Sequence, residues 1–298
     1  DMTRENTPGL PNFNTEGAIF MSAQRKTDNC KIGIFGVPYD GTTSFRPGTR
    51  FGPNAIREIS NGIETYCPQL NLDLEDLKFA DLGSLEINTG APEPVIECVK
   101  KATQILVRKE LKPLILGGEH SITSGAVEAV TEKYPDLILV QLDAHADLRN
   151  DWLGNKFNHA CAMKRCLEVL PSKTLFQVGI RSGTKEEFKE MRNAKRLISN
   201  IKSKNSQELE KALSPHLNKP IYLTFDLDWF DPSQMPGTGT PEPGGYSWED
   251  FASVVNVLRK HQIVGADIVE LSPQLDQSGI SSVLAAKTTR TLLLLMGK

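Results

Sequence analysis

The sequence predicts a three-layer αβα fold of the α/β class, with a doubly wound, mostly parallel sheet of eight strands. Two observations support this prediction. Short, almost continuously apolar runs, such as 137–143 (LILVQLD) and 221–228 (IYLTFDLD), are typical of strands that are covered on both faces. These runs alternate along the chain with segments of helical periodicity, which is the pattern of βαβ units.

Each expected element follows from its local pattern. Eight mainly apolar runs are the expected strands: 31–37 (KIGIFGV), 78–82 (KFADL), 113–117 (PLILG), 137–143, 174–180 (TLFQVGI), 196–199 (RLIS), 221–228 and 263–271 (IVGADIVEL). The segments with helical spacing are the expected helices: 92–110, 121–133, 160–170, 184–193, 206–216, 247–261 and 280–296. Helix 92–110 is the clearest, because Pro92 opens it and Val95, Val99 and Leu106 share one face.

Residues 30–298 are expected to form one domain, because no linker, internal repeat or low-complexity segment interrupts the alternation of strands and helices. Residues 1–29 show little periodicity and are expected to form an irregular N-terminal arm. The Gly- and Pro-rich segment 235–245 (MPGTGTPEPGG) follows directly after a predicted strand. We therefore interpret it as a loop on the ligand-binding face of the sheet.

Composition argues against several functional classes. The net charge is −3 and the Lys and Arg residues are scattered, so no nucleic-acid partner is expected. Five cysteines without a C-x-x-C motif indicate reduced thiols, and the N-terminus shows no signal-peptide pattern, so we expect a cytoplasmic protein. The longest apolar run near the C-terminus, 292–296, is far too short to cross a bilayer, so no membrane partner is expected.

Acids and histidines gather where three of the predicted strands end. They are His120 after strand 113–117, Asp143, His145 and Asp147 at the end of strand 137–143, and Asp226 and Asp228 at the end of strand 221–228. Alternate residues of an extended chain share a face, so each acidic pair can point to one spot. Because ligands bind beyond the carboxyl ends of parallel strands, the pattern predicts one site formed by all three strand ends.

Electrostatics predicts that this site holds two divalent cations. Four carboxylates about 5 Å apart, at an effective dielectric constant of about 20, repel by about 3 kcal/mol per pair and roughly 20 kcal/mol in total. No Lys or Arg at these strand ends offsets the repulsion, although Arg149 is nearby, whereas two divalent ions would cancel the four charges. Carboxylates with two imidazoles and no thiolate suit Mn²⁺ better than structural Zn²⁺.

Each motif has a simpler structural interpretation when it is taken alone. An acid directly after a strand is commonly a turn or cap residue, so a single D-x-H-x-D is a weak signal. His120 by itself would be interpreted as a structural histidine. The combination of three such strand ends in one chain favours the two-metal site.

Three motifs at these strand ends resemble the metal-binding signatures of the ureohydrolase family, which includes arginase and agmatinase. They are GGEHS at 117–121, DAHAD at 143–147 and FDLDWFDP at 225–232, in the same order and at similar separations. The resemblance covers nearly the whole chain, beginning with GVPYDGT at 36–42. One departure is Glu119, where the family often has Asp at a position that does not bind metal.

The resemblance implies an arginase-like fold and a binuclear manganese hydrolase that cleaves a guanidino compound to urea and an amine, with residues 30–298 as the catalytic domain. One Mn²⁺ would be bound by His120, Asp143, Asp147 and Asp226, and the other by Asp143, His145, Asp226 and Asp228. Asp143 and Asp226 would bridge the two ions. A two-metal site lowers the pKa of water and supplies hydroxide at neutral pH. The family resemblance also implies a homotrimer or homohexamer.

Three catalytic residues are also implied by the resemblance. Glu270, at the end of predicted strand 263–271, matches the family glutamate that hydrogen-bonds the guanidinium, and a carboxylate can bind that planar group in bidentate fashion. His159 matches the catalytic histidine that moves a proton, and it heads a predicted helix whose positive end favours neutral imidazole. Asp147 is both a metal ligand and a catalytic residue. Without the resemblance, His159 could equally be an ordinary histidine.

Agmatine, cleaved to putrescine and urea, is the substrate that the sequence favours. The loop 237–245 is similar to the agmatinase version of this segment. In arginases, Gly-Leu-Arg is typically followed by an Asp that helps to hold the substrate α-amino group, whereas Gly179-Ile180-Arg181 is followed here by Ser182. Arginine, guanidinobutyrate and guanidine are the alternatives, because relatives hydrolyse each of them.

Two other classes of protein are alternatives to a two-metal enzyme. An amide deacetylase on a related sheet uses one Zn²⁺ and a tandem His pair, which this chain lacks. An inactive regulatory paralogue usually loses a ligand or the proton-moving histidine, whereas all six ligand positions, His159 and Glu270 are occupied here by the expected residue types. The sequence therefore favours an active enzyme.

Overall fold

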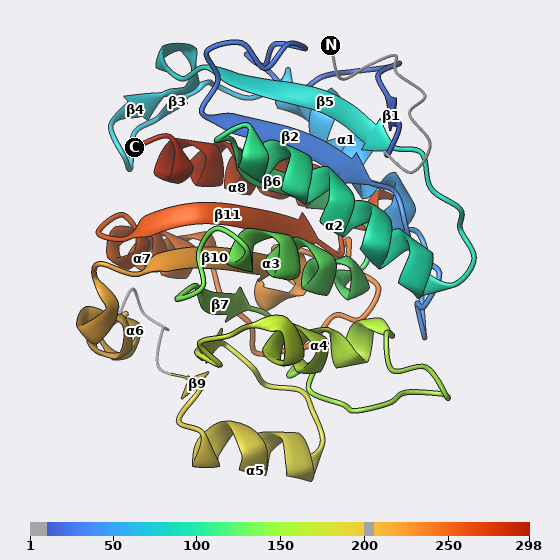
Figure 1. The fold of residues 1–298 in the computed structure, drawn as a ribbon, viewed down its shortest axis with the longest axis vertical. Coiled ribbons are helices and arrows are strands. Elements are labelled where there is room, and N and C mark those ends of the chain that lie inside the picture. Colours follow the sequence, from blue (N-terminus) through green and yellow to red (C-terminus); the bar gives the residue numbers. More distant parts are fainter. Residues whose placement is uncertain (1–10, 200–205) are drawn as a thin grey trace.

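The computed structural model describes residues 11–199 and 206–298, and a nine-stranded sheet runs through its centre (Figure 1). The strands of this sheet are β1 (Phe13–Asn14), β2 (Ile32–Val37), β5 (Phe79–Leu85), β6 (Lys112–Gly117), β7 (Ile138–Leu142), β8 (Leu175–Val178), β9 (Leu197–Ile198), β10 (Pro220–Asp226) and β11 (Gln262–Val269). They lie in the order β1-β5-β2-β6-β11-β10-β7-β8-β9. A separate hairpin is formed by β3 (Tyr66–Cys67) and β4 (Leu72–Asp73).

The predicted parallel sheet is confirmed, and it gains one strand. β1 pairs antiparallel with β5, whereas all other neighbours in the sheet are parallel. β1 lies in the segment expected to be irregular, and its Phe13 packs edge-on against Phe35 of β2. Phe20 and Met21 of the same segment are buried. A two-residue strand shows no periodicity, so the sequence pattern could not reveal it.

Helices cover both faces of the sheet (Figure 1). Their bounds are α1 Gly52–Ser60, α2 Pro92–Arg108, α3 Thr123–Thr131, α4 Ala162–Val169, α5 Lys185–Asn193, α6 Gln207–Leu213, α7 Trp248–Leu258 and α8 Ile280–Met296. α2 packs on α3 and α3 on α4 on one face, while α1 packs on α8 on the other. None of the helices in the described ranges is both long and apolar enough to cross a membrane.

Two apolar cores, one on each face of the sheet, hold these layers together. Neighbouring strand residues alternate between them: Leu114 belongs to the core under α1, α7 and α8, and Ile115 to the core under α2, α3 and α4. Leu139 and Val140 divide in the same way. Burial on both faces explains why the central strands are almost continuously apolar.

The strand order decides which loops meet. β6, β11, β10 and β7 are consecutive neighbours and all are parallel, so their carboxyl ends lie at one edge of the sheet. β6 and β7 follow each other among the strands of the chain but are separated in the sheet by the two last strands, β11 and β10. This arrangement brings together residues that are up to about half the chain apart.

Candidate active site and metal centre

The predicted site residues converge at the carboxyl edge of the four central strands. His120 begins a short 3₁₀ turn after β6, Asp143, His145 and Asp147 follow β7, Asp226 and Asp228 lie at the end of β10, and Glu270 follows β11. All seven are buried except His145, which is partly exposed. The structure therefore brings the predicted ligands and the predicted guanidinium-binding acid into one cluster.

His120 is surrounded by three carboxylates. Its Nδ1 atom lies 3.0 Å from Oδ2 of Asp143, 3.0 Å from Oδ2 of Asp147 and 3.5 Å from Oδ2 of Asp226. His120, Asp143 and Asp147 each offer one atom to a group whose members are all within 4.8 Å of one another. This spacing suits ligands that share one cation.

A second group forms around His145. Its Nδ1 atom lies 2.9 Å from Oδ2 of Asp228 and 3.6 Å from Oδ1 of Asp143. Asp143 therefore belongs to both groups and turns one carboxylate oxygen toward each imidazole. The backbone helps to orient the acids, because Asp226 accepts a hydrogen bond from the Asp228 N–H and Asp228 accepts one from the Ala144 N–H.

Thr224 fixes the tautomer of His120 from the Nε2 side of the ring, opposite the carboxylates at Nδ1. The His120 Nε2 atom lies 2.7 Å from the Thr224 hydroxyl, which donates its hydrogen to Asp267 at 2.7 Å. The second carboxylate oxygen of Asp267 accepts from the Tyr222 hydroxyl. Thr224 must therefore accept from Nε2–H of His120, which leaves the lone pair of Nδ1 pointing at the carboxylates. A histidine held in this way is suited to bind a metal ion through Nδ1.

Two buried atoms of the cluster lack hydrogen-bond partners. Within the described residues, His120 Nδ1 and Asp228 Oδ2 form no hydrogen bond, and one of them lies in each group. An unpaired buried polar atom costs about 1–3 kcal/mol, so such atoms are rare unless another ligand satisfies them. Carboxylate oxygens with a minority of imidazole nitrogens are the donor set of divalent cations such as Mn²⁺. The residues present therefore fit two cations.

The pKa shifts of the clustered aspartates also support bound cations. Burial and the neighbouring carboxylates raise the pKa of Asp226 well above its usual value, and the same two causes raise the pKa of Asp147 to about 6. Burial also opposes ionisation of Asp143, but the imidazoles of His120 and His145 outweigh it and hold the pKa of Asp143 below its usual value. Burial and like charge therefore oppose ionisation of Asp147 and Asp226, and bound cations would favour it.

The backbone is strained at two of the predicted catalytic residues. Asp147 has a φ of 51° and Glu270 a φ of 72°, a left-handed conformation that costs roughly 1–2 kcal/mol for residues other than glycine. Hydrogen bonds hold both in place. The Glu270 N–H donates to the Gly118 carbonyl and its Oε1 accepts from the His120 N–H, each at 2.8 Å, and the Asp147 carbonyl accepts from the Met163 N–H.

A cavity of about 200 Å³ opens onto this cluster. Its lining includes His120, His145, Asp147, His159, Ser182 and Glu270. His159 begins a 3₁₀ turn ahead of α4, and Asn158 caps that turn. Burial, together with nearby imidazoles, lowers the pKa of His159 to about 4, so its ring is neutral at pH 7. The structure thus brings four of the six metal-ligand candidates and all three catalytic candidates to one opening.

The loop after β2 forms one wall of this site. A Cβ atom at Gly118 would lie only 1.9 Å from the Tyr39 carbonyl oxygen, so only glycine permits the close approach of this loop. The Glu119 N–H donates to the same carbonyl, and Asp40 accepts from the Gly48 N–H. These contacts place Thr42 and Ser44 within hydrogen-bonding distance of the two ring nitrogens of His159.

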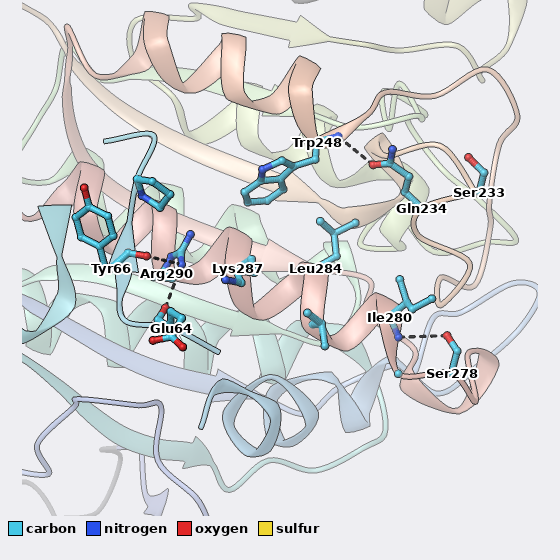
Figure 2. Close-up of a pocket in the computed structure, with 13 residues that line it drawn as sticks. Glu64, Tyr66, Ser233, Gln234, Trp248, Ser278, Ile280, Leu284, Lys287 and Arg290 are labelled. Atoms are coloured by element: carbon cyan, nitrogen blue, oxygen red, sulfur yellow. Dashed lines mark hydrogen bonds between the residues drawn. The ribbon is translucent and has the colours of Figure 1, made fainter. Parts of the chain in front are cut away.

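A larger cavity of about 840 Å³ lies elsewhere, over α8 (Figure 2). Trp248 and Leu284 contribute apolar surface, and Arg290 donates to the carbonyls of Glu64 and Tyr66. Among the described residues its lining holds a single acid, Glu64, and no histidine. Its size alone does not make it the reaction site, because the clustered acids and imidazoles lie at the sheet edge.

Comparison with known proteins shows the family. The model of the arginase family matches residues 30–295. The chain is 36% identical to an agmatinase of Bacillus subtilis over 280 residues, 93% of this chain and 96% of the relative. It is 40% identical to an N(1)-aminopropylagmatine ureohydrolase of Thermococcus kodakarensis over 80% of this chain and 82% of the relative. The chain belongs to the arginase family.

Solved structures agree with this assignment. A crystal structure of a putative agmatinase from Clostridium difficile superposes with a TM-score of 0.86 at 42% identity, covering 91% of this chain and 99% of the other. The arginase-like fold implied by the three motifs is therefore confirmed. As a member of the arginase family, the protein is a metal-dependent hydrolase of the ureohydrolase type.

The arginase-family motifs do not reveal every residue that shapes the site. Thr42, Ser44 and Thr224 contact the imidazoles of His159 or His120, yet none of them stands out in the sequence. Threonine and serine are common after strands, and their partners here lie more than 100 residues away. The one available signal is that Thr42 ends the GVPYDGT segment at 36–42 and Ser44 follows two residues later.

Proposed function

We propose that this protein hydrolyses agmatine to putrescine and urea with two bound Mn²⁺ ions. The observation that carries the proposal is the pair of Asp/His groups sharing Asp143, next to Glu270 in one narrow cavity. Such a cavity suits a linear, unbranched guanidino compound better than a bulky substrate.

The metal-binding roles are those that the family resemblance implies; the two groups support them for every ligand except Asp226, whose Oδ2 lies 3.5 Å from His120 Nδ1. His120, Asp143, Asp147 and Asp226 would hold one ion, and Asp143, His145, Asp226 and Asp228 the other, with Asp143 and Asp226 shared. The oxygen-rich donor set supports Mn²⁺. When bound, the two ions would lower the pKa of water enough to supply hydroxide at neutral pH.

The chain's own residues would bind and orient the guanidinium group. This group is a weak electrophile because its charge is spread over three nitrogens, so attack requires close alignment. The carboxylate of Glu270 lines the cavity and would accept hydrogen bonds from the planar guanidinium. Asp147, also in the cavity wall, would accept a hydrogen bond from the attacking water through a carboxylate oxygen.

His159 would move the proton that the leaving amine requires. An amine leaves readily only once it is protonated, and a neutral imidazole can take up a proton from one group and deliver it to another. The lowered pKa keeps the ring of His159 in that neutral form at pH 7. Its position in the lining of the cavity supports this role.

Ser182 supports agmatine as the substrate rather than arginine. Ser182 lies beside the second metal group, because its N–H donates to the Ala144 carbonyl and its own carbonyl accepts from the Ala146 N–H. A neutral side chain there offers no counter-charge for an α-amino group. Agmatine lacks the α-carboxylate of arginine and places its amine at the end of the chain. The names of the two relatives above, which act on agmatine or its aminopropyl derivative, also favour agmatine.

A urea assay tests the proposal. Purified protein loaded with Mn²⁺ is expected to release urea from agmatine at a higher kcat/KM than from arginine, 4-guanidinobutyrate or guanidine. A much faster reaction with one of the other three would make the substrate assignment wrong and leave the reaction type intact. No urea from any of the four would overturn the proposed function.

Exchanging Ser182 for aspartate is expected to shift the preference toward arginine. The new carboxylate supplies a partner for an α-amino group, and we expect the ratio of kcat/KM for arginine to that for agmatine to rise at least about tenfold. Ser182→Asn is the matched control, since it has the same shape without the charge and should leave the ratio near that of the parent. An unchanged ratio in Ser182→Asp would show that this position does not determine the preference between arginine and agmatine.

We also propose a homotrimer or homohexamer in the cytoplasm. All five cysteines are free thiols, which supports a reducing compartment. The assembly is a family expectation, and sedimentation or light scattering measures it directly.

A further inference from the structure

We propose that Glu119 and Thr42 form a positioning relay that fixes the tautomer of His159, with the proton on Nδ1 and the lone pair on Nε2. The inference rests on the proposed function, in which His159 moves a proton. Glu119 and Thr42 would act through His159 and are not themselves metal ligands or catalytic residues.

The carboxylate of Glu119 is buried and surrounded by hydrogen-bond donors. Its Oε2 atom accepts from the Thr42 N–H at 2.9 Å and its Oε1 atom from the Thr42 hydroxyl at 2.5 Å. The Ser121 hydroxyl donates to Oε1 at 2.5 Å, and the Thr43 hydroxyl lies 3.5 Å from Oε2. All of these groups carry a hydrogen to donate, so they favour the ionised carboxylate, although burial raises the pKa of Glu119 to about 7.

The hydroxyl of Thr42 connects this carboxylate to His159. It accepts a hydrogen bond from the His159 backbone N–H at 3.0 Å, and it also lies 3.1 Å from His159 Nδ1. A hydroxyl has one hydrogen and two lone pairs. The hydrogen goes to Glu119, because a carboxylate is the stronger acceptor and also the nearer one. The second lone pair of Thr42 then faces Nδ1, so Nδ1 must carry the proton.

This proton pattern decides what the ring can do. With the proton on Nδ1, the lone pair of Nε2 is free to take up a proton and deliver it to the leaving amine. The Ser44 hydroxyl lies 3.4 Å from Nε2 and can donate to its lone pair. The opposite tautomer would place a hydrogen on Nε2, which would then have no lone pair to accept a proton. A fixed tautomer is worth a large factor where histidine transfers protons, as the histidine of the Ser-His-Asp triad illustrates.

Two substitutions at Thr42 test the relay. Thr42→Val removes the hydroxyl at nearly the same volume, whereas Thr42→Ser keeps it. With agmatine as substrate, we expect kcat to fall about 10- to 100-fold in Thr42→Val, with KM within about twofold and metal content unchanged. Thr42→Ser should recover most of kcat. Thr43→Val is the matched control, because this hydroxyl only approaches Glu119 at 3.5 Å, whereas the ring nitrogens of His159 have Thr42 and Ser44 as their hydrogen-bond partners among the described residues.

A spectroscopic measurement reads the tautomer without relying on turnover. Long-range ¹H–¹⁵N correlation spectra of protein labelled with ¹⁵N-histidine and loaded with diamagnetic Mg²⁺ distinguish Nδ1–H from Nε2–H. We expect the Nδ1–H pattern for His159 in the parent and in Thr42→Ser, and loss of that pattern in Thr42→Val. The His159→Asn spectrum identifies the resonance by its absence.

The outcomes separate the relay from the proposed function. An Nε2–H pattern in the parent, parental kcat in Thr42→Val, or equal defects in Thr42→Val and Thr42→Ser would each overturn the relay. If Thr42→Val does not fold, Glu119→Gln replaces it, since the Thr42 N–H and hydroxyl donate to different carboxylate oxygens and the amide nitrogen that replaces one of them cannot accept. Absence of urea release from every substrate would overturn the proposed function, while the histidine spectrum would still decide the tautomer.

Discussion

Replacing Asp143 with asparagine is expected to lower urea release at least a thousandfold and to remove most of the bound metal. Asp143 is shared by the two Asp/His groups, so one substitution weakens both metal positions at once. Residues that only orient a ligand typically contribute 10- to 100-fold to metal affinity or activity, and loss of a shared ligand should cost more. Elemental analysis of the purified variant and a urea assay measure the two effects.

Thermal unfolding gives an independent measurement for the same variant. Mn²⁺ at a hundred times its dissociation constant should stabilise the parent by about 2.7 kcal/mol, and this gain should be absent in Asp143→Asn. Asp136→Asn is the matched control, because it makes the same chemical change at the other end of β7 in an exposed residue that pairs with Lys219. An Asp143→Asn variant that keeps two ions per subunit and the parental melting shift would contradict the shared-ligand role.

Replacing Glu270 with glutamine is expected to lower kcat/KM for agmatine by about 10²- to 10³-fold while leaving the metal content unchanged. The isosteric amide can still accept the hydrogen bond from the His120 N–H, so the local geometry should persist. What it loses is the negative charge that, in the proposed role, would face the guanidinium, and removing one partner of a buried charged pair typically costs 2–5 kcal/mol. Steady-state kinetics and metal analysis measure the two quantities.

The control for this substitution is Glu86→Gln. Glu86 directly follows β5 as Glu270 directly follows β11, but its side chain is exposed. We expect Glu86→Gln to keep the parental kcat/KM. Parental activity in Glu270→Gln would remove this residue from guanidinium binding, and loss of metal in it would instead indicate a structural role.

Much of the fold could be predicted because burial leaves a simple pattern. The predicted strand 137–143 became β7 (Ile138–Leu142), and the predicted helix 280–296 became α8 at the same bounds. Helix α1 was not predicted, since its apolar spacing is broken by Arg57. This arginine is buried and pairs with Asp81 of β5 at 2.9 Å. A charge that is buried only because a distant partner neutralises it cannot be recognised from local periodicity.

The candidate site also has residues that the sequence could reveal and residues that only the packing reveals. Acids and histidines at strand ends are visible in the sequence, because their spacing of two residues turns them to one side and four like charges require an explanation. Thr42 and His159 are 117 residues apart in the sequence. Their contact depends on how the loop after β2 packs against Gly118. Glu119 shows the limit best: the sequence marks it as a departure from the family, and only the packing shows that it contacts Thr42.

The placement of β11 and β10 between β6 and β7 has a consequence for biosynthesis. A chain emerging from the ribosome would expose His120, Asp143 and Asp147 well before Asp226, Asp228 and Glu270 were made. The ends of β6 and β7 reach their spacing in the sheet only after β11 and β10 have inserted between these two strands. A nascent chain that ends before β10 would lack Asp226, Asp228 and Glu270, so we expect both ions of the proposed centre to bind only after the last strands have been made.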